Sequence, residues 1–251
     1  MWDIAARISY QIETCTYRLE QTCDGYTRQL GSLLARKGFT KGSRIDDIWS
    51  QSVYLAIQAF LTDACVLRNY LAEFAAEYVY QYGGTVRIRT LANLIKLVIQ
   101  KEMTCDSLTV QLRNATAPGG WLAVLGLYRD LIVHSAPLAL AKNRLWVRCE
   151  TIGVADAEGT PAMRFPLPGD PGAIMSARSS GNLFHDFATV ADQFSGAADA
   201  DAPNRDALEY MHDVFGDLVA FALELGSYSP LSPEMPVLTD RDLKGPIQWN
   251  T

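Results

Sequence analysis

The sequence predicts a mainly α-helical protein, an antiparallel helical bundle with a small β-hairpin inserted into it. Two long N-terminal stretches place apolar residues three or four positions apart, which is the spacing of one buried helix face. Short turn sequences that contain glycine separate the helical stretches, as in an antiparallel bundle. After about residue 145 the apolar period shortens to two, which is typical of strands.

The first predicted helix runs from the N-terminus to the turn sequence KGFTKGS at 37–43. Its apolar positions are Ile4, Ile8, Ile12, Cys15, Leu19, Cys23, Tyr26, Leu30 and Leu33. A second helix is predicted over 44–82, with the same spacing from Ile45 to Tyr78, and Gly83-Gly84 ends it. Each helix therefore has one apolar stripe to pack against its neighbours.

Three shorter helices are predicted to complete the bundle, at about 86–102, 105–115 and 121–137. Pro118-Gly119-Gly120 breaks the chain before the last of them, and Pro137 ends it. The bundle is therefore expected to close by about residue 140.

A β-hairpin is predicted next, because apolar residues alternate with polar ones at Leu145, Val147, Cys149, Met163 and Phe165. The turn-rich stretch DAEGTPA lies between the two runs, and 166–181 is expected to be loop. A last helix is predicted over 205–226, and a tail with four prolines follows. We expect residues 1–140 to form the bundle and 141–251 to pack on the same domain.

Charge is distributed unequally along the chain. Residues 1–149 contain 17 Lys and Arg against 12 Asp and Glu, whereas 150–251 contain 5 against 16. One interpretation is a basic surface for an anionic partner, restrained by an acidic C-terminal segment. The alternative is an ordinary soluble surface with acidic loops.

Several classes of protein are excluded by what the sequence lacks. It has no P-loop, GxGxxG, GxSxG or HExxH motif, and its five cysteines are scattered without a CxxC pair, so neither a cofactor nor a metal site is expected. No apolar run is long enough to span a membrane, and no secretory signal is visible. These features predict a cytoplasmic protein with no membrane partner.

The strongest candidate for chemistry lies in LYRDLIVHSAP, at 127–137. Arg129 and Asp130 precede three apolar residues, and His134 follows. Imidazole can transfer protons near neutral pH, and a guanidinium holds phosphate oxygens through its planar fork. Five residues span about 140° on an ideal α-helix, so the two side chains do not share one narrow face, and a long Arg side chain or a helix loosened near Pro137 would be needed to bring them together.

This stretch resembles the functional motif of the HEPN superfamily, an Arg followed after four to six residues by a His, late in a helical bundle. The resemblance covers about residues 1–140, and the chain departs from one toxin subset because Ala136 stands where that subset has Tyr. It implies a metal-independent endoribonuclease in which Arg129 stabilises the phosphate and His134 is the general acid or base. It further implies RNA as substrate, a homodimer, a bacterial toxin or phage-defence role, and an antitoxin or sensor protein as partner.

Further residues are assigned supporting roles. Asp130 and Ser135 adjoin the motif, and Asp63 interrupts the apolar second helix, as Arg68 and Asn69 also do. A basic cluster that follows the motif is a candidate for RNA phosphate contacts: Lys142, Arg144 and Arg148.

The motif also has an interpretation in which it does no chemistry. In it the Arg129–His134 pair is structural, and the chain is a non-catalytic HEPN-like scaffold or partner-binding protein. The other histidines, His185 and His212, lack an Arg at the motif spacing and are not site candidates.

Overall fold

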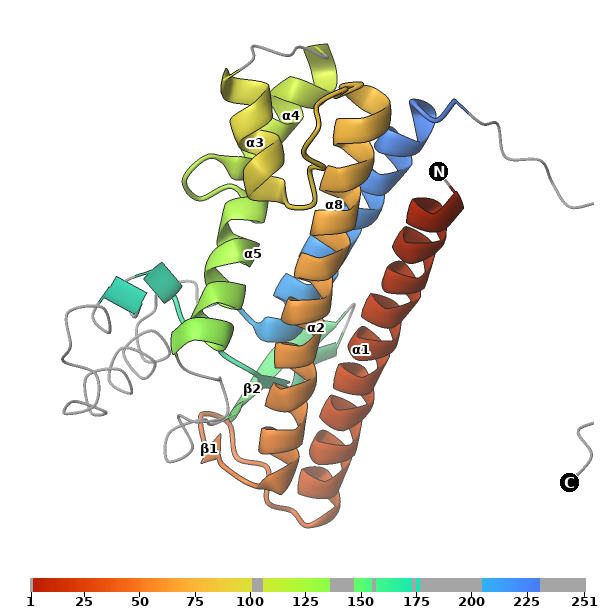
Figure 1. Ribbon diagram of the computed structural model, residues 1–251. Helices are drawn as coiled ribbons and strands as arrows, with labels where there is room; N and C mark the ends of the chain where they lie inside the picture. Colours follow the sequence, from red (N-terminus) through yellow and green to blue (C-terminus); the bar gives the residue numbers. More distant parts are fainter. Residues whose placement is uncertain are drawn as a thin grey trace, which may run out of the picture.

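A computed structural model describes residues 2–100, 106–135, 147–154, 157–172, 175–176 and 205–230. Within these residues the chain is mainly helical and carries a small antiparallel sheet of three strands (Figure 1). The predicted fold class is therefore confirmed.

Two long helices form the frame of the molecule. Helix α1 spans Trp2–Ala35 and α2 spans Ile48–Phe74, and the two lie side by side along their length (Figure 1). Asp47 begins α2 by accepting a hydrogen bond from the Ser50 amide at 2.8 Å. In α1, Ile4 and Cys15 of the predicted stripe are buried and most of its other members are partly buried against the core. Three polar residues that the stripe did not include are also buried there: Gln11, Thr22 and Gln29.

The shorter helices surround one side of α2. Helix α2 continues into a single π-helical turn, η1 (Ala75–Val79), and then come α3 (Leu91–Gln100), α4 (Asp106–Thr116) and α5 (Trp121–Asp130). Figure 1 shows α5 and α1 on opposite sides of α2. Helix α3 begins five residues later than predicted, because the Thr90 side chain accepts from the Asn93 amide and caps it there.

The sheet contains one strand more than the predicted hairpin. Strands β2 (Val147–Val154) and β3 (Ala157–Arg164) form the hairpin, and β1 (Arg44–Ile45) pairs with β2. The prediction of helix at Arg44–Ile45 was therefore wrong: a two-residue strand depends on its distant partner, which local periodicity cannot reveal. Most of DAEGTPA also proves to be strand, in β3.

The C-terminal helix α8 (Ala207–Ser227) belongs to the same core. It packs against α2 and α1 and buries Met211, Val214 and Leu218. Asp206 caps it by accepting from the Leu208 and Glu209 amides, and also accepts from the Phe165 amide at 2.8 Å. Removing the acidic C-terminal third would therefore strip part of the core as well as its charge.

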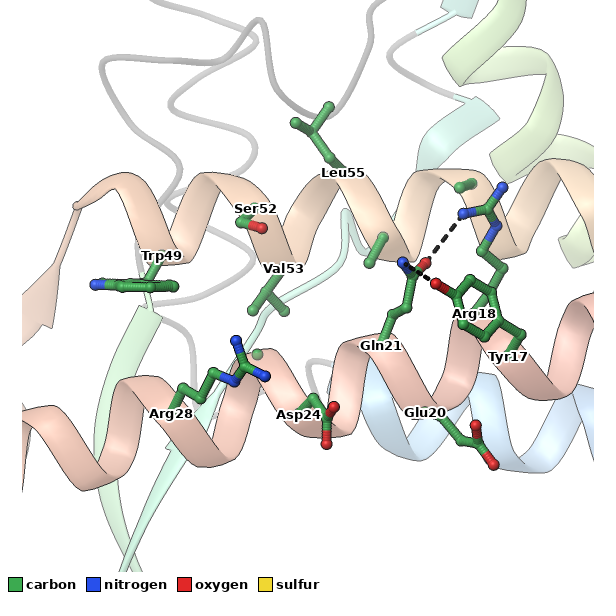
Figure 2. A pocket seen from close by; sticks show the side chains of 13 residues that line it. Tyr17, Arg18, Glu20, Gln21, Asp24, Arg28, Trp49, Ser52, Val53 and Leu55 are labelled. Atoms are coloured by element: carbon green, nitrogen blue, oxygen red, sulfur yellow. Dashed lines mark hydrogen bonds between the residues drawn. The ribbon is translucent and has the colours of Figure 1, made fainter. Parts of the chain in front are cut away.

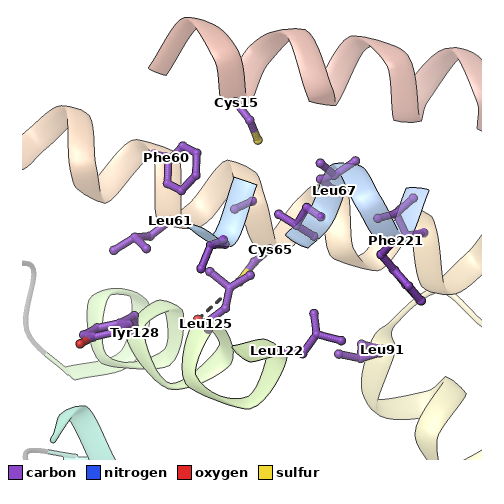
Figure 3. Packing of buried hydrophobic residues seen from close by; sticks show 14 of the residues in the cluster. Cys15, Phe60, Leu61, Cys65, Leu67, Leu91, Leu122, Leu125, Tyr128 and Phe221 are labelled. Carbon is purple, nitrogen blue, oxygen red and sulfur yellow. Dashed lines mark hydrogen bonds between the residues drawn. The ribbon is translucent and has the colours of Figure 1, made fainter. Parts of the chain in front are cut away.

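The core between these elements is apolar and continuous. Figure 3 shows side chains from α1, α2, α5 and α8 meeting around α2, with Cys65 facing α5. Two buried tyrosines fasten the segment after β3 to the bundle: Tyr54 donates to the Pro166 carbonyl at 3.0 Å, and Tyr128 donates to the Pro168 carbonyl at 2.8 Å. Both α2 and α5 are thereby joined to the segment that follows β3.

Candidate functional site

The end of α5 changes its helix type at the predicted motif. After Asp130 the chain forms a π-helical turn, η2, over Leu131–Ser135. In a π-helix the hydrogen bonds join residues i and i+5, so each residue turns the chain by less than in an α-helix. The angle of about 140° expected between Arg129 and His134 on an ideal α-helix is thereby reduced.

Arg129 and His134 consequently meet on the surface. The Nη1 atom of Arg129 lies 3.2 Å from Nε2 of His134 and 2.7 Å from Oδ1 of Asp130. A guanidinium can only donate, so a hydrogen bond in this contact requires the ring tautomer in which Nε2 is the acceptor. The Arg129 side chain is 37% exposed and His134 is exposed, so both can be reached from solvent.

The supporting residues are placed differently. Asp130 pairs with Arg129, and Ser135 is the last residue of η2. Asp63 lies elsewhere: its carboxylate accepts from Arg18 of α1 at 3.0 Å. The structure therefore brings Asp130 and Ser135 to the motif and directs Asp63 toward α1, on the other side of α2.

The predicted RNA-binding cluster is only partly described. Lys142 and Arg144 lie outside the described residues. Arg148 lies in β2, half-buried, opposite Arg44 of β1 and Arg164 of β3, and its Nε is 3.5 Å from the Glu150 carboxylate. Three strands thus place arginines side by side, with Glu150 paired to two of them, because Arg164 also contacts it at 3.1 Å.

Arg68 was not assigned to the site by the sequence, although it does interrupt an apolar helix. Its Nη1 lies 3.1 Å from where a Cβ would stand on Gly126, one turn before Arg129 on α5. Its Nε is buried and has no hydrogen-bond partner. The signal available in the sequence was a polar residue that interrupts the apolar second helix.

The buried side chain of Cys65, in α2, lies beneath the same part of α5. Its thiol points to the Leu125 carbonyl of α5, at 3.7 Å (Figure 3). Burial raises the pKa of Cys65 to about 11, and the positive charges of Arg68 and Arg129 oppose that rise. Both guanidiniums therefore act on one thiol beneath α5, while Asp130 acts in the opposite direction.

A separate hollow lies between α1 and α2, away from the motif. It has a volume of about 490 Å³ and is lined by residues of both helices (Figure 2). Figure 2 shows Trp49 and Val53 of α2 facing Arg28 and Gln21 of α1. Tyr17, Trp49 and Leu55 expose large apolar surfaces there. Neither Arg129 nor His134 lines it.

Among the residues that the structure describes, no three His, Cys, Asp or Glu side chains are grouped as metal ligands would be. In the same part of the chain, no helix combines the length and the apolar character that crossing a membrane requires. Compared with known proteins, the chain matches no protein family, no curated protein and no solved structure.

Proposed function

We propose that the protein is a metal-independent endoribonuclease of the HEPN type. The observation that carries the proposal is the 3.2 Å contact between Arg129 Nη1 and His134 Nε2 on an exposed surface. A cation that can grip phosphate and a base that can transfer a proton are held together by a π-helical turn. Single π-helical turns inside helices are frequent at functional sites.

The reaction follows from the chemistry of these two groups. His134 Nε2 takes the proton of a ribose 2′-hydroxyl, and the 2′-oxygen attacks the neighbouring phosphorus. The new P–O2′ bond replaces the P–O5′ bond, which gives a 2′,3′-cyclic phosphate and, once a proton reaches the leaving oxygen, a 5′-hydroxyl. Arg129 stabilises the added negative charge on the phosphate oxygens. For this step the guanidinium must turn from Nε2 to the phosphate, which frees the Nε2 lone pair.

A homodimer supports this mechanism because the step needs an acid as well as a base. In a dimer that brings two motifs together, His134 of the partner subunit supplies the proton to the 5′-oxygen. The end of α5 and η2 offer apolar surface for such a contact: Leu127 and Val133 are exposed side chains, two residues before Arg129 and one before His134 in the chain. Burying them against a second copy would stabilise the dimer through the hydrophobic effect.

The biological setting is proposed from the resemblance. A growth-arresting toxin or phage-defence effector in the cytoplasm, restrained by an antitoxin or sensor protein, fits an RNA-cleaving activity of this type.

The test compares RNA cleavage by the wild type, Arg129→Ala and His134→Ala. Total RNA from expressing cells and a purified RNA incubated with purified protein and EDTA are both run on gels. Matched controls remove an Arg and a His elsewhere, Arg36→Ala and His212→Ala, both at exposed positions. Cleavage that survives EDTA and both controls but is lost in both motif variants supports the proposal. Equal behaviour of all five proteins contradicts it.

The alternative, a non-catalytic partner-binding protein, has one observation in its favour. The hollow between α1 and α2 exposes Tyr17, Trp49 and Leu55. Aromatic residues such as Tyr17 and Trp49 are enriched at protein interfaces. In this case growth effects would persist in His134→Ala and would be lost in Trp49→Ala. The two proposals therefore assign the biological effect to different faces of the bundle.

A further inference from the structure

Arg68 is a cation whose charge is not neutralised where it stands. Among the described residues it makes neither an ion pair nor a side-chain hydrogen bond, and its Nε is buried. Arg68 as a whole is half-buried, and leaving its buried Nε donor without a partner is costly unless a further group completes it. The guanidinium extends from α2 toward α5.

Gly126 makes room for this side chain. A methyl group at that position would lie 3.1 Å from Arg68 Nη1, which is closer than ordinary van der Waals contact. Residue 126 stands three positions before Arg129 and four before Asp130, so all three share one face of α5. The Arg68 guanidinium therefore reaches the same face of α5 that carries the motif.

Charge at this face is positive. Arg68 and Arg129 contribute two positive charges, and Asp130, the carboxylate paired with Arg129, offsets one. Both guanidiniums act on the Cys65 thiol beneath α5, which places them in one electrostatic neighbourhood. Two guanidiniums and one carboxylate leave a net positive charge, which a bound anion would neutralise.

We propose that Arg68 and Arg129 together form a phosphate-binding subsite for the backbone of single-stranded RNA. Arg68 is a positioning residue: it holds a phosphodiester beside the motif and does not itself transfer a proton. This inference rests on the proposed function, because it assigns the phosphate to an RNA substrate. Gly126 serves the subsite by leaving the guanidinium space.

The test measures binding separately from cleavage. The full chain carrying His134→Ala is titrated with a fluorescent 2′-O-methyl RNA, which has no 2′-hydroxyl to attack, and the affinity is followed against salt concentration. Arg68→Gln should weaken binding about tenfold or more at low salt, as for loss of a charged hydrogen bond. The slope of log affinity against log salt should become shallower by about 0.7, the value for one single-strand phosphate contact.

Three further variants distinguish a binding role from a structural one. Arg68→Lys keeps the charge and should keep most of the salt slope, whereas Arg36→Gln removes an exposed charge elsewhere and should leave affinity nearly unchanged. Gly126→Ala favours the helix yet crowds the guanidinium, so it should weaken binding without lowering the melting temperature. Unchanged affinity and slope in Arg68→Gln and Gly126→Ala would overturn the inference.

Cleavage by the otherwise unmodified chain decides the proposed function on its own. RNA binding that depends on Arg68, without cleavage by the wild type, supports the subsite and contradicts the nuclease. Cleavage whose KM and kcat are both unchanged in Arg68→Gln supports the nuclease and overturns the subsite. If the wild type binds no RNA, the subsite is overturned.

Discussion

Arg129 and His134 stand five residues apart in the chain, yet Nη1 and Nε2 lie 3.2 Å from each other. The π-helical turn η2 between them contributes to this contact, since it turns the chain by less per residue than an α-helix does. A pair held by one turn of backbone is sensitive to its register, and this sensitivity can be tested.

Exchanging two neighbours, Val133→His together with His134→Val, keeps the composition and moves the imidazole by one position. The ring should then leave the face of Arg129, and RNA cleavage should fall by roughly 10²-fold or more, which is the usual contribution of general acid–base catalysis. Initial rates of cleavage measure this. Full activity in the exchanged variant would show that any nearby imidazole suffices.

The apolar surface beside the motif should matter for assembly. Val133 is 48% exposed, and Val133→Glu places a charge where the proposed dimer is dry. We expect the wild type to sediment as a dimer and Val133→Glu as a monomer. Leu223→Glu, at a 73% exposed position of α8, is the matched control and should remain dimeric. A monomeric wild type contradicts the composite site.

Glu73, at the end of α2, should be important for stability. Its carboxylate is 5% exposed and receives Arg7 at 3.0 Å and Arg87 at 2.6 Å. Glu73→Ala removes the partner of both guanidiniums, which are themselves 30% and 52% exposed. We therefore expect the free energy of unfolding in urea to fall by about 1–3 kcal/mol. Glu77 also faces Arg87, at 3.8 Å, but is 46% exposed. Glu77→Ala should cost about 1 kcal/mol or less.

Two buried thiols should limit stability at alkaline pH. Burial raises the pKa of Cys15 to about 12 and of Cys65 to about 11, from an ordinary value near 9. Their contribution to stability is therefore complete below pH 9 and is lost as the pH rises toward the folded values. The two together should lower the free energy of unfolding by up to about 3 kcal/mol per pH unit in that window.

Urea titrations at pH 7.5, 9 and 10 test the effect of the thiols. The variant with Cys15→Ala and Cys65→Ala should start less stable, because two cavities are created, but lose stability less steeply above pH 9. Parallel pH dependences in the two proteins would assign alkaline unfolding to other groups, such as Tyr128, whose pKa burial raises to about 12.

The helices could be predicted because the spacing of their apolar residues depends only on neighbouring positions in the sequence. Positions such as Ile4 and Cys15 repeat at helical spacing, and both are buried as expected. Strand β1 could not be predicted, because Arg44 and Ile45 become strand only when residues 147 and 148 arrive from far along the chain. The π-helical turn has no pattern of its own; its trace in the sequence is the five-residue interval between two polar groups in an apolar stretch.

The sequence also could not show on which side of α2 each polar residue lies. Asp63 and Arg68 are five positions apart in an ordinary α-helix, so they point about 140° away from each other. The structure directs Asp63 to Arg18 of α1 and Arg68 to Gly126 of α5. Apolar periodicity shows that a helix has a buried face, but it does not say which neighbour covers which polar residue.

The pairing of β1 with β2 also has a consequence for how the protein is made. Arg44 finds its partner Arg148 about a hundred residues later, so on the ribosome β1 must wait some 5–20 s for the strand that completes it. Helices α1 and α2 can pair long before then, since a short turn joins them. Closing this long loop is a late step, so translation speed between residues 45 and 147 sets how long the unfinished end of the bundle stays open.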